Sequence, residues 1–330
     1  MISTLALPVD DPALEARLAA RMEEVERALH EHVRSEAPFV TEAARHLMEA
    51  GGKRFRPLLV LLAAETGDAD APGVLTSACV VELTHLASLY HDDVMDEADL
   101  RRGTMSANAR WDNHVAILTG DFLFSKSSEL TASLGADAVR IQAQTFTRLV
   151  EGQILETLGP LGGEDPLEHY LRVVAGKTGS LIATSARYGA RFAGAPRDVE
   201  EALTEYGEKV GVAFQLSDDI LDIGSETAES GKTPGTDLRE GVPTLPVLIA
   251  RRSTDAADAR LLELLASDLS DDDAHAEALR LLRSHPAMAE ARAYVIGLAG
   301  EAKQLLKVLP EGSVRTALEQ FADVVATRTG

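Results

Sequence analysis

The sequence is poor in several residue types, and each shortage limits what the chain can be. Among 330 residues Cys79 is the one cysteine, which excludes a disulfide framework and a cysteine-based zinc site. Aromatic residues make up 4%, and no run of 18 or more apolar residues is present, so we expect no membrane-spanning helix. The first residues lack the basic and apolar segments of a secretory signal, and we therefore expect a cytoplasmic protein.

Basic residues are also scarce. The chain has 32 lysines and arginines against 53 aspartates and glutamates, a formal net charge of -21. Nucleic acid is not an expected partner, because binding its phosphates requires a basic surface. Hydrophobic residues, in contrast, make up 45%, and Ala, Leu, Glu and Arg are good helix formers. The composition therefore favours a helical protein with a sizeable core.

Apolar residues recur at helical spacing along most of the chain, and no sustained alternation indicates a sheet. The spacing over residues 12–34 predicts a long helix with a broad apolar face, formed by Leu14, Leu18, Met22, Val25, Leu29 and Val33. Further helices are expected to end at Gly51-Gly52, to begin at Pro57 and cover 58–65, and to span 74–90, 114–134, 136–158, 166–188, 199–221 and 243–252, with shorter helices over 256–329. No long linker marks a domain boundary, so we predict one all-α domain over residues 1–330, a bundle of about ten or more helices.

Two segments share a pattern of three aspartates at the end of an apolar helical run. The first has Asp92, Asp93 and Asp96, and the second has Asp218, Asp219 and Asp222. In each, two carboxylates four positions apart lie on one helical face. Such carboxylates repel one another near a helix C-terminus, so they are stabilised by water or by bound cations. A solvated helix end explains one cluster, whereas two clusters favour a metal site, and oxygen ligands of this kind suit magnesium with substrate phosphates.

Cationic residues accompany both clusters although the chain is acidic. Lys53, Arg54 and Arg56 follow Gly51-Gly52, Arg101 and Arg102 follow the first cluster, and Lys232 follows the second. A glycine pair lets the backbone approach a phosphate, and the cations supply charge. Surface ion pairs explain any one of these cations, but the group indicates diphosphate binding.

Two further residues leave more than one interpretation open. Lys177 lies in a Gly-Lys-Thr segment that is not a phosphate-binding loop, because Leu171 stands where that loop needs a glycine, yet its ammonium could still reach a phosphate. His85 lies two turns before Asp92, where it could face the same cavity or be a hydrogen-bonded core histidine.

Five segments, in order, resemble the motifs of the polyprenyl synthetase family, the trans-type isoprenyl diphosphate synthases. They are GGKRFRP, ELTHLASLYHDDVMDEADLRRG, KT, GVAFQLSDDILD and GKTPGTDLREGVPTLP. The resemblance implies a helical fold of the isoprenoid synthase type around a central cavity. It also implies a magnesium-dependent prenyltransferase with three magnesium ions per active site, which condenses isopentenyl diphosphate with an allylic prenyl diphosphate.

The resemblance gives each matched residue an expected role. Metal would be bound by Asp92, Asp96, Asp218 and Asp222, and the catalytic set would also include Asp93, Asp219, Lys177 and Lys232. Isopentenyl diphosphate would be held by Gly52, Lys53, Arg56, His85 and Arg102. The allylic diphosphate would be held by Arg101, Lys177, Thr178, Gln215 and Lys232.

The product length is expected to depend on the helix that precedes Asp92. At about 1.5 Å per residue, Ala87 and Ser88 lie roughly 6–8 Å below the metal site, with Thr84 a turn deeper. These small residues leave room for a growing tail, which predicts a long-chain product of the kind used for quinone side chains. If the floor lies elsewhere, for example around residues 122–124, the product is geranylgeranyl diphosphate.

Two other classes of protein share part of this pattern. A terpene cyclase would carry a different second metal motif and would need no second diphosphate site, and a non-catalytic regulatory subunit would lack some of the acids. A homodimer is expected from the resemblance and from the apolar face of the long N-terminal helix. The sequence leaves open the exact product, the preferred primer, the downstream pathway, any auxiliary subunit, and a transient membrane contact for product release.

Overall fold

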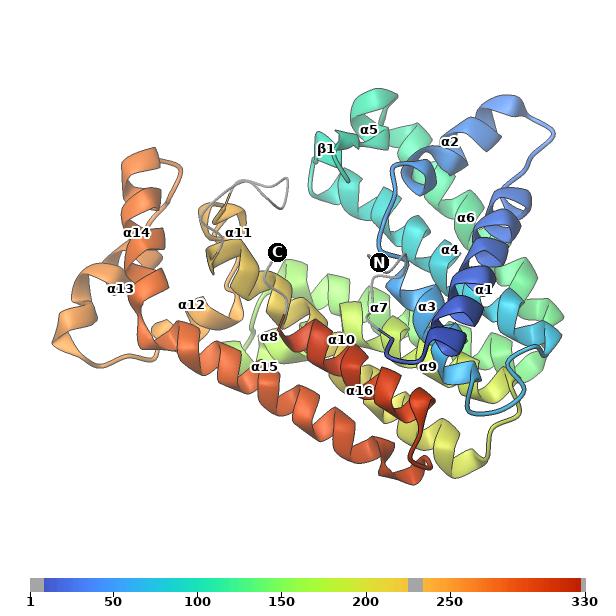
Figure 1. Cartoon of the computed structure of the whole chain (residues 1–330). Coiled ribbons are helices and arrows are strands. Elements are labelled where there is room, and N and C mark those ends of the chain that lie inside the picture. Colours follow the sequence, from blue (N-terminus) through green and yellow to red (C-terminus); the bar gives the residue numbers. More distant parts are fainter. Residues whose placement is uncertain (1–8, 225–233, 328–330) are drawn as a thin grey trace. The chain divides into compact units, whose positions relative to one another are not determined.

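The structure, a computed structural model, describes residues 9–224 and 234–327, which are mostly helical (Figure 1). Lys232 lies outside the described residues. The elements, in chain order, are α1 (Pro12–His32), α2 (Pro38–Glu49), α3 (Phe55–Ala64), α4 (Pro72–Met95), β1 (Leu100–Arg101), β2 (Thr104–Met105), α5 (Ala107–Arg110), α6 (Asn113–Ser133), α7 (Ala136–Leu158), α8 (Pro166–Val174), the π-helix η1 (Ala175–Gly179), α9 (Ser180–Phe192), α10 (Arg197–Gly224), α11 (Thr236–Arg239), α12 (Leu245–Ala250), the 3₁₀ helix η3 (Ala256–Asp258), α13 (Ala259–Leu265), α14 (Asp272–Ser284), α15 (Pro286–Leu305), the 3₁₀ helix η4 (Leu306–Val308) and α16 (Ser313–Ala326).

The chain forms two compact units. The first consists of Met1–Phe146, Leu181–Gly207 and Leu306–Gln320, and the second of Thr147–Ser180, Glu208–Leu305 and Phe321–Gly330. Helices α7, α10 and α16 contribute residues to both. The expectation of one domain over residues 1–330 stays a prediction.

Helix α4 is the central element of the first unit, where it packs against α1, α3 and α6. Most of its residues from Val74 to Tyr90 are buried. Among the described residues it is the one helix long and apolar enough to cross a membrane, but 72% of its apolar window is buried, as is typical of a core helix. Its burial on most sides fixes the position of the aspartates at its end.

The apolar face of α1 is used inside the first unit. Leu14, Leu18, Val25 and Leu29 have at most 1% of their surface exposed, and α1 packs against α3 and α4. The expectation that this face supplies a dimer contact is therefore wrong, because a side chain that is buried against its own chain has no surface left for a partner.

Several predicted boundaries need correction. Helix α3 begins at Phe55, two residues before Pro57, because Arg54 at its N-cap adopts a left-handed conformation with φ 48°. The helix predicted over 166–188 is interrupted by η1, where Gly176 and Gly179 weaken the regular α-helical pattern. Helix α12 is shorter than predicted, and the hairpin of β1 and β2 was not expected from the sequence.

In the second unit, α12 packs against α8 and α15, and α11 packs against α14. The end of α10 is tied to α11 through the carboxylate of Asp222, which accepts hydrogen bonds from the backbone nitrogens of Thr236 (3.3 Å) and Asp237 (3.1 Å). The second aspartate cluster therefore also helps to fix the segment that follows it.

Candidate active site

The first aspartate cluster stands at the C-terminal end of α4. Asp92 lies in the last turn and is half-buried, and Asp96 is the C-cap with an exposed side chain. Asp93 faces the core and is fully buried. Its Oδ1 accepts a hydrogen bond from Arg101 Nε at 2.5 Å, and its Oδ2 is buried without a partner among the described residues. Burial raises the pKa of Asp93, and the nearby Arg101 guanidinium opposes that shift.

The hairpin β1–β2 presents the two arginines that follow this cluster. Arg102 and Gly103 form its turn with φ values of 53° and 76°, a combination typical of a tight two-residue hairpin turn. Arg101, in the strand before the turn, is held by Asp93 and lies 4.0 Å from Asp96. Arg102 turns toward the Gly51-Gly52 loop, donating to Leu47 O at 2.9 Å and to Gly51 O.

Gly52 has a specific reason to be glycine. Its φ is +135°, and a Cβ added there would lie 2.8 Å from Cζ of Arg102. The guanidinium therefore rests against the bare backbone of the loop. The structure brings Gly52 and Arg102 together, as expected for two residues of one diphosphate site, while Lys53 is exposed on the same loop.

A buried carboxylate that the sequence analysis missed organises the other cations of this unit. Glu82 is 2% exposed and pairs with Arg54 at 3.1 Å, and Arg54 also pairs with Glu26 at 2.6 Å. Arg54 is thus held in ion pairs within the protein, although its sequence neighbours Lys53 and Arg56 are predicted to bind substrate. A glutamate inside an apolar helical run, three residues before His85, was the signal that could have revealed it.

Arg56 and His85 lie in the same electrostatic environment. Burial lowers the pKa of Arg56 to about 10, with Glu82 opposing that shift, so the side chain stays charged at neutral pH. Its Nε is buried without a partner within the described ranges. Burial, reinforced by the charges of Arg56 and Arg102, holds the pKa of His85 well below its usual range. His85 is therefore a neutral imidazole beside cations.

The second aspartate cluster, on α10, also has a buried middle residue between two more exposed ones. Asp218 and Asp222 are half-buried, whereas the middle residue, Asp219, is 3% exposed. Asp219 accepts hydrogen bonds from Gln215 Nε2 at 3.0 Å and from the Tyr170 hydroxyl. Burial raises the pKa of Asp219 well above its usual value, and the charges of Asp237 and Asp222 add to the effect.

The predicted allylic ligands of the second unit form a connected chain of contacts. Thr178 donates through Oγ1 to Gln215 Oε1 at 3.2 Å, and Gln215 in turn holds Asp219. Lys177, next to Thr178 in the π-helical turn, pairs with Glu156 of α7 at 2.5 Å. Glu156 and Tyr170 are the partners in this unit that sequence reasoning did not identify.

The three predicted chain-length residues differ in their surroundings. Ala87 and Thr84 have no exposed surface, whereas Ser88 is half-buried on the face of α4 that carries Asp92. Thr84 Oγ1 bonds to Ser127 Oγ at 2.8 Å and accepts from Gln142 Nε2 at 2.6 Å. Phe124, from the alternative floor region, contacts the ring of His91 with centroids 5.6 Å apart.

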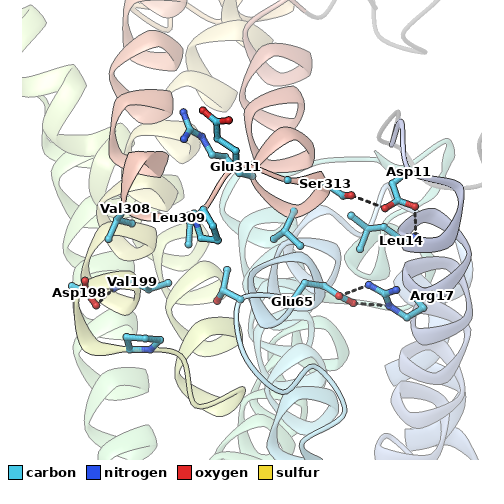
Figure 2. A pocket seen from close by; sticks show the side chains of 16 residues that line it. Asp11, Leu14, Arg17, Glu65, Asp198, Val199, Val308, Leu309, Glu311 and Ser313 are labelled. Carbon is cyan, nitrogen blue, oxygen red and sulfur yellow. Dashed lines mark hydrogen bonds and ion pairs between the residues drawn. The ribbon is translucent and has the colours of Figure 1, made fainter.

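A pocket of the first unit lies between the ends of α1, α3, α10 and α16 (Figure 2). Its volume is about 510 Å³. It contains none of the predicted site residues. Its charged lining is mostly acidic, with Asp11, Glu65, Asp198 and Glu311 against Arg17 and Arg315. Arg17 is moreover paired with Glu65 at 2.5 Å. A surplus of carboxylates disfavours a diphosphate, so this pocket is not the predicted substrate site.

Known proteins match this chain over nearly all of its length. The sequence model of the polyprenyl synthetase family matches residues 37–282. A nonaprenyl diphosphate synthase of Mycobacterium tuberculosis is 46% identical over 331 residues, covering 99% of both chains. A heptaprenyl diphosphate synthase component 2 of Geobacillus stearothermophilus is 40% identical over 314 residues, covering 94% of this chain and 95% of the relative.

A solved structure gives the same result for the fold. The geranylgeranyl pyrophosphate synthase of Corynebacterium glutamicum, in complex with calcium and isoprenyl diphosphate, superimposes with a TM-score of 0.88 and 45% identity. The match covers 98% of this chain and 100% of that one, which confirms the all-α isoprenoid synthase fold. Because the family model spans most of the sequence and the relatives match it almost from end to end, the chain belongs to the polyprenyl synthetase family and is a prenyltransferase.

Proposed function

We propose that this enzyme makes a long-chain all-trans polyprenyl diphosphate by repeated condensation of isopentenyl diphosphate with an allylic prenyl diphosphate, and that it depends on magnesium. The main support for the proposal is that the two aspartate clusters have the same arrangement of buried and more exposed side chains. In each, the middle carboxylate is buried and held by side-chain donors, while the outer two side chains are half-buried or exposed. Two such pairs, each accompanied by cations, suit a metal-bound diphosphate.

The outer aspartates fit a divalent metal that shares its ligands with the substrate. Within residues 9–224 and 234–327, no three His, Cys, Asp or Glu side chains are grouped closely enough to hold a metal alone. Magnesium usually takes one or two carboxylates and completes its coordination with water and phosphate oxygens. Asp92 and Asp96, and Asp218 and Asp222, would hold such ions, three per active site. The metal would supply positive charge that stabilises the departing diphosphate.

The remaining site residues would bind and orient the two substrates. Lys177, Thr178, Gln215 and Arg101 would hold the allylic diphosphate, so that its C–O bond ionises while the diphosphate is stabilised by hydrogen bonds and charge. Arg56, Arg102, Lys53, Gly52 and neutral His85 would hold isopentenyl diphosphate, whose double bond attacks the allylic cation. Loss of a proton, with the released diphosphate as base, restores an allylic diphosphate one unit longer.

A long product is favoured by the residues before Asp92 and by the relatives. Ser88 is small, and it is half-buried on the same face of α4 as Asp92. Relatives named as nonaprenyl and heptaprenyl synthases match nearly the whole chain. Geranylgeranyl diphosphate is the second candidate product, because the structure with 45% identity is a geranylgeranyl synthase.

The test is incubation of the purified chain with magnesium, isopentenyl diphosphate and farnesyl diphosphate, followed by chromatography of the dephosphorylated products. We expect products with more than four isoprene units from the chain alone. Products of four units or fewer would support the geranylgeranyl alternative. A requirement for a second protein would make this chain one component of a larger synthase, and cyclised hydrocarbons would indicate a cyclase.

A further inference from the structure

Lys177 is fixed by a stripe of residues on α7 that the family motifs of the sequence analysis did not include. The stripe consists of Arg148, Gly152 and Glu156, which are four residues apart and so lie on one face of the helix. All three contact the π-helical turn η1, in which Lys177 stands. Arg148 and Gly152 contact the backbone of η1, and Glu156 contacts the ammonium group of Lys177.

The backbone of η1 approaches α7 closely at its glycines. A Cβ added to Gly152 would lie 2.6 Å from the backbone nitrogen of Lys177, and one added to Gly176 would lie 2.9 Å from the carbonyl oxygen of Arg148. Arg148 Nη2 also donates to Ala175 O at 3.4 Å. Only glycine allows so close a contact at these positions, and it places the Cα of Lys177 at a defined distance from the helix.

One turn beyond Gly152, the Glu156 carboxylate accepts a hydrogen bond from Lys177 Nζ at 2.5 Å. Both side chains are partly buried, with about a quarter and two-fifths of their surface exposed. A lysine side chain has four flexible carbons, so its ammonium is localised only when a partner holds it. One bond to Glu156 leaves two of the three ammonium protons for other acceptors. Gly152 thus fixes the backbone of Lys177, and Glu156 fixes its ammonium group.

We propose that Glu156 is a positioning residue, which holds the Lys177 ammonium in place to receive the allylic diphosphate. The proposal rests on the proposed function, since it takes Lys177 as a ligand of that diphosphate. It makes a prediction opposite in sign to that of simple electrostatics. Removing a carboxylate near an anion-binding site should tighten binding by charge alone, whereas removing a positioning group should weaken it.

The test is a double-mutant cycle with Glu156→Ala, Lys177→Met and the combined variant. Glu156→Ala should raise KM for the allylic diphosphate about tenfold, and Glu156→Gln, which keeps an acceptor, should raise it less. In the Lys177→Met background the same Glu156→Ala change should alter KM by less than about twofold. Glu151→Ala, an exposed glutamate of the same helix, is the matched control and should leave KM unchanged.

Calorimetric titration with farnesyl diphosphate and magnesium, without isopentenyl diphosphate, should give the same pattern in Kd. This readout needs no turnover, so it tests the inference even if chain elongation is not observed. Tighter or unchanged binding by Glu156→Ala would overturn the proposal. So would a full loss of affinity that persists in the Lys177→Met background, because Glu156 would then act on the substrate or metal directly.

Discussion

At the scale of single residues, each aspartate cluster contains two kinds of carboxylate. The helix points the middle residue, Asp93 or Asp219, toward the core, and it points the residues on either side toward accessible space. The middle carboxylates are occupied by protein donors, Arg101 in one case and Gln215 with Tyr170 in the other. We infer that the middle aspartates orient site residues, whereas the outer ones, which are half-buried or exposed, contribute oxygen atoms to cations.

Replacement of an outer aspartate should remove activity without unfolding the protein. For Asp92→Ala or Asp218→Ala we expect turnover to fall about a thousandfold or more, because charge stabilisation of the leaving diphosphate is lost. The melting temperature should stay near that of the wild type, since neither side chain belongs to the buried core. Asp273→Ala, in the exposed first turn of α14, is the control. Full activity of metal-stripped wild type in EDTA would contradict the underlying metal dependence.

The depressed pKa of His85 predicts a pH dependence of stability. Burial and neighbouring arginines keep this imidazole neutral in the folded protein, while in the unfolded chain it takes up a proton near its ordinary pKa of 6.5. Its contribution to folding is therefore complete above pH 6.5 and is lost as the pH falls below that value. The melting temperature of His85→Gln should fall less between pH 8 and pH 5.5 than that of the wild type. Parallel falls would show that His85 is not protected from protonation.

At the scale of elements, the Gly51-Gly52 loop offers a matched pair of substitutions. Both glycines have positive φ, at +96° and +135°, so alanine strains the backbone at either position. A Cβ at Gly52 would also press on the Arg102 guanidinium, whereas a Cβ at Gly51 would meet nothing within 4 Å. We expect Gly52→Ala to raise KM for isopentenyl diphosphate about tenfold more than Gly51→Ala does. Equal effects in steady-state kinetics would mean that Arg102 does not act through this contact.

Helix α4 carries the prediction on product length. Ala87 is fully buried, and a phenylalanine there would disturb the core. Ser88 is half-buried on the face of Asp92, so it can accept a larger side chain. Ser88→Phe should shorten the main product by several isoprene units, as measured by chromatography, and Ser88→Ala should leave it unchanged. An unaltered product from Ser88→Phe would place the floor elsewhere, and the Phe124 region would then be the next candidate.

At the scale of the whole molecule, the homodimer stays a prediction, but its surface must differ from the one first expected. The α1 face is buried within the chain, whereas α6 and α7 expose Ile117, Leu118, Val139 and Phe146. Leu118 has 65% of its surface exposed, so this large apolar side chain is open to a partner. Light scattering should give twice the chain mass of 35.2 kDa for the wild type and a smaller mass for Leu118→Glu. A monomeric wild type would refute the prediction.

The sequence by itself determined the helical class and most helix positions, and it predicted the chemistry of the site. Apolar periodicity predicts helices, and α7 follows the prediction from end to end, because local spacing decides which face of a helix is buried. The aspartate clusters and adjacent cations are likewise local patterns, and their residue types alone indicate a metal-bound diphosphate.

Only the tertiary structure decided which partner each charged residue takes. Glu82 with Arg54, Glu156 with Lys177 and Tyr170 with Asp219 are pairs from separate parts of the chain. The π-helical turn η1 and the burial of the α1 face also depend on neighbours, namely α7 in one case and α3 with α4 in the other. The physical reason is that periodicity reports which side of a helix is apolar, whereas pairing and backbone distortion are set by what packs against that side.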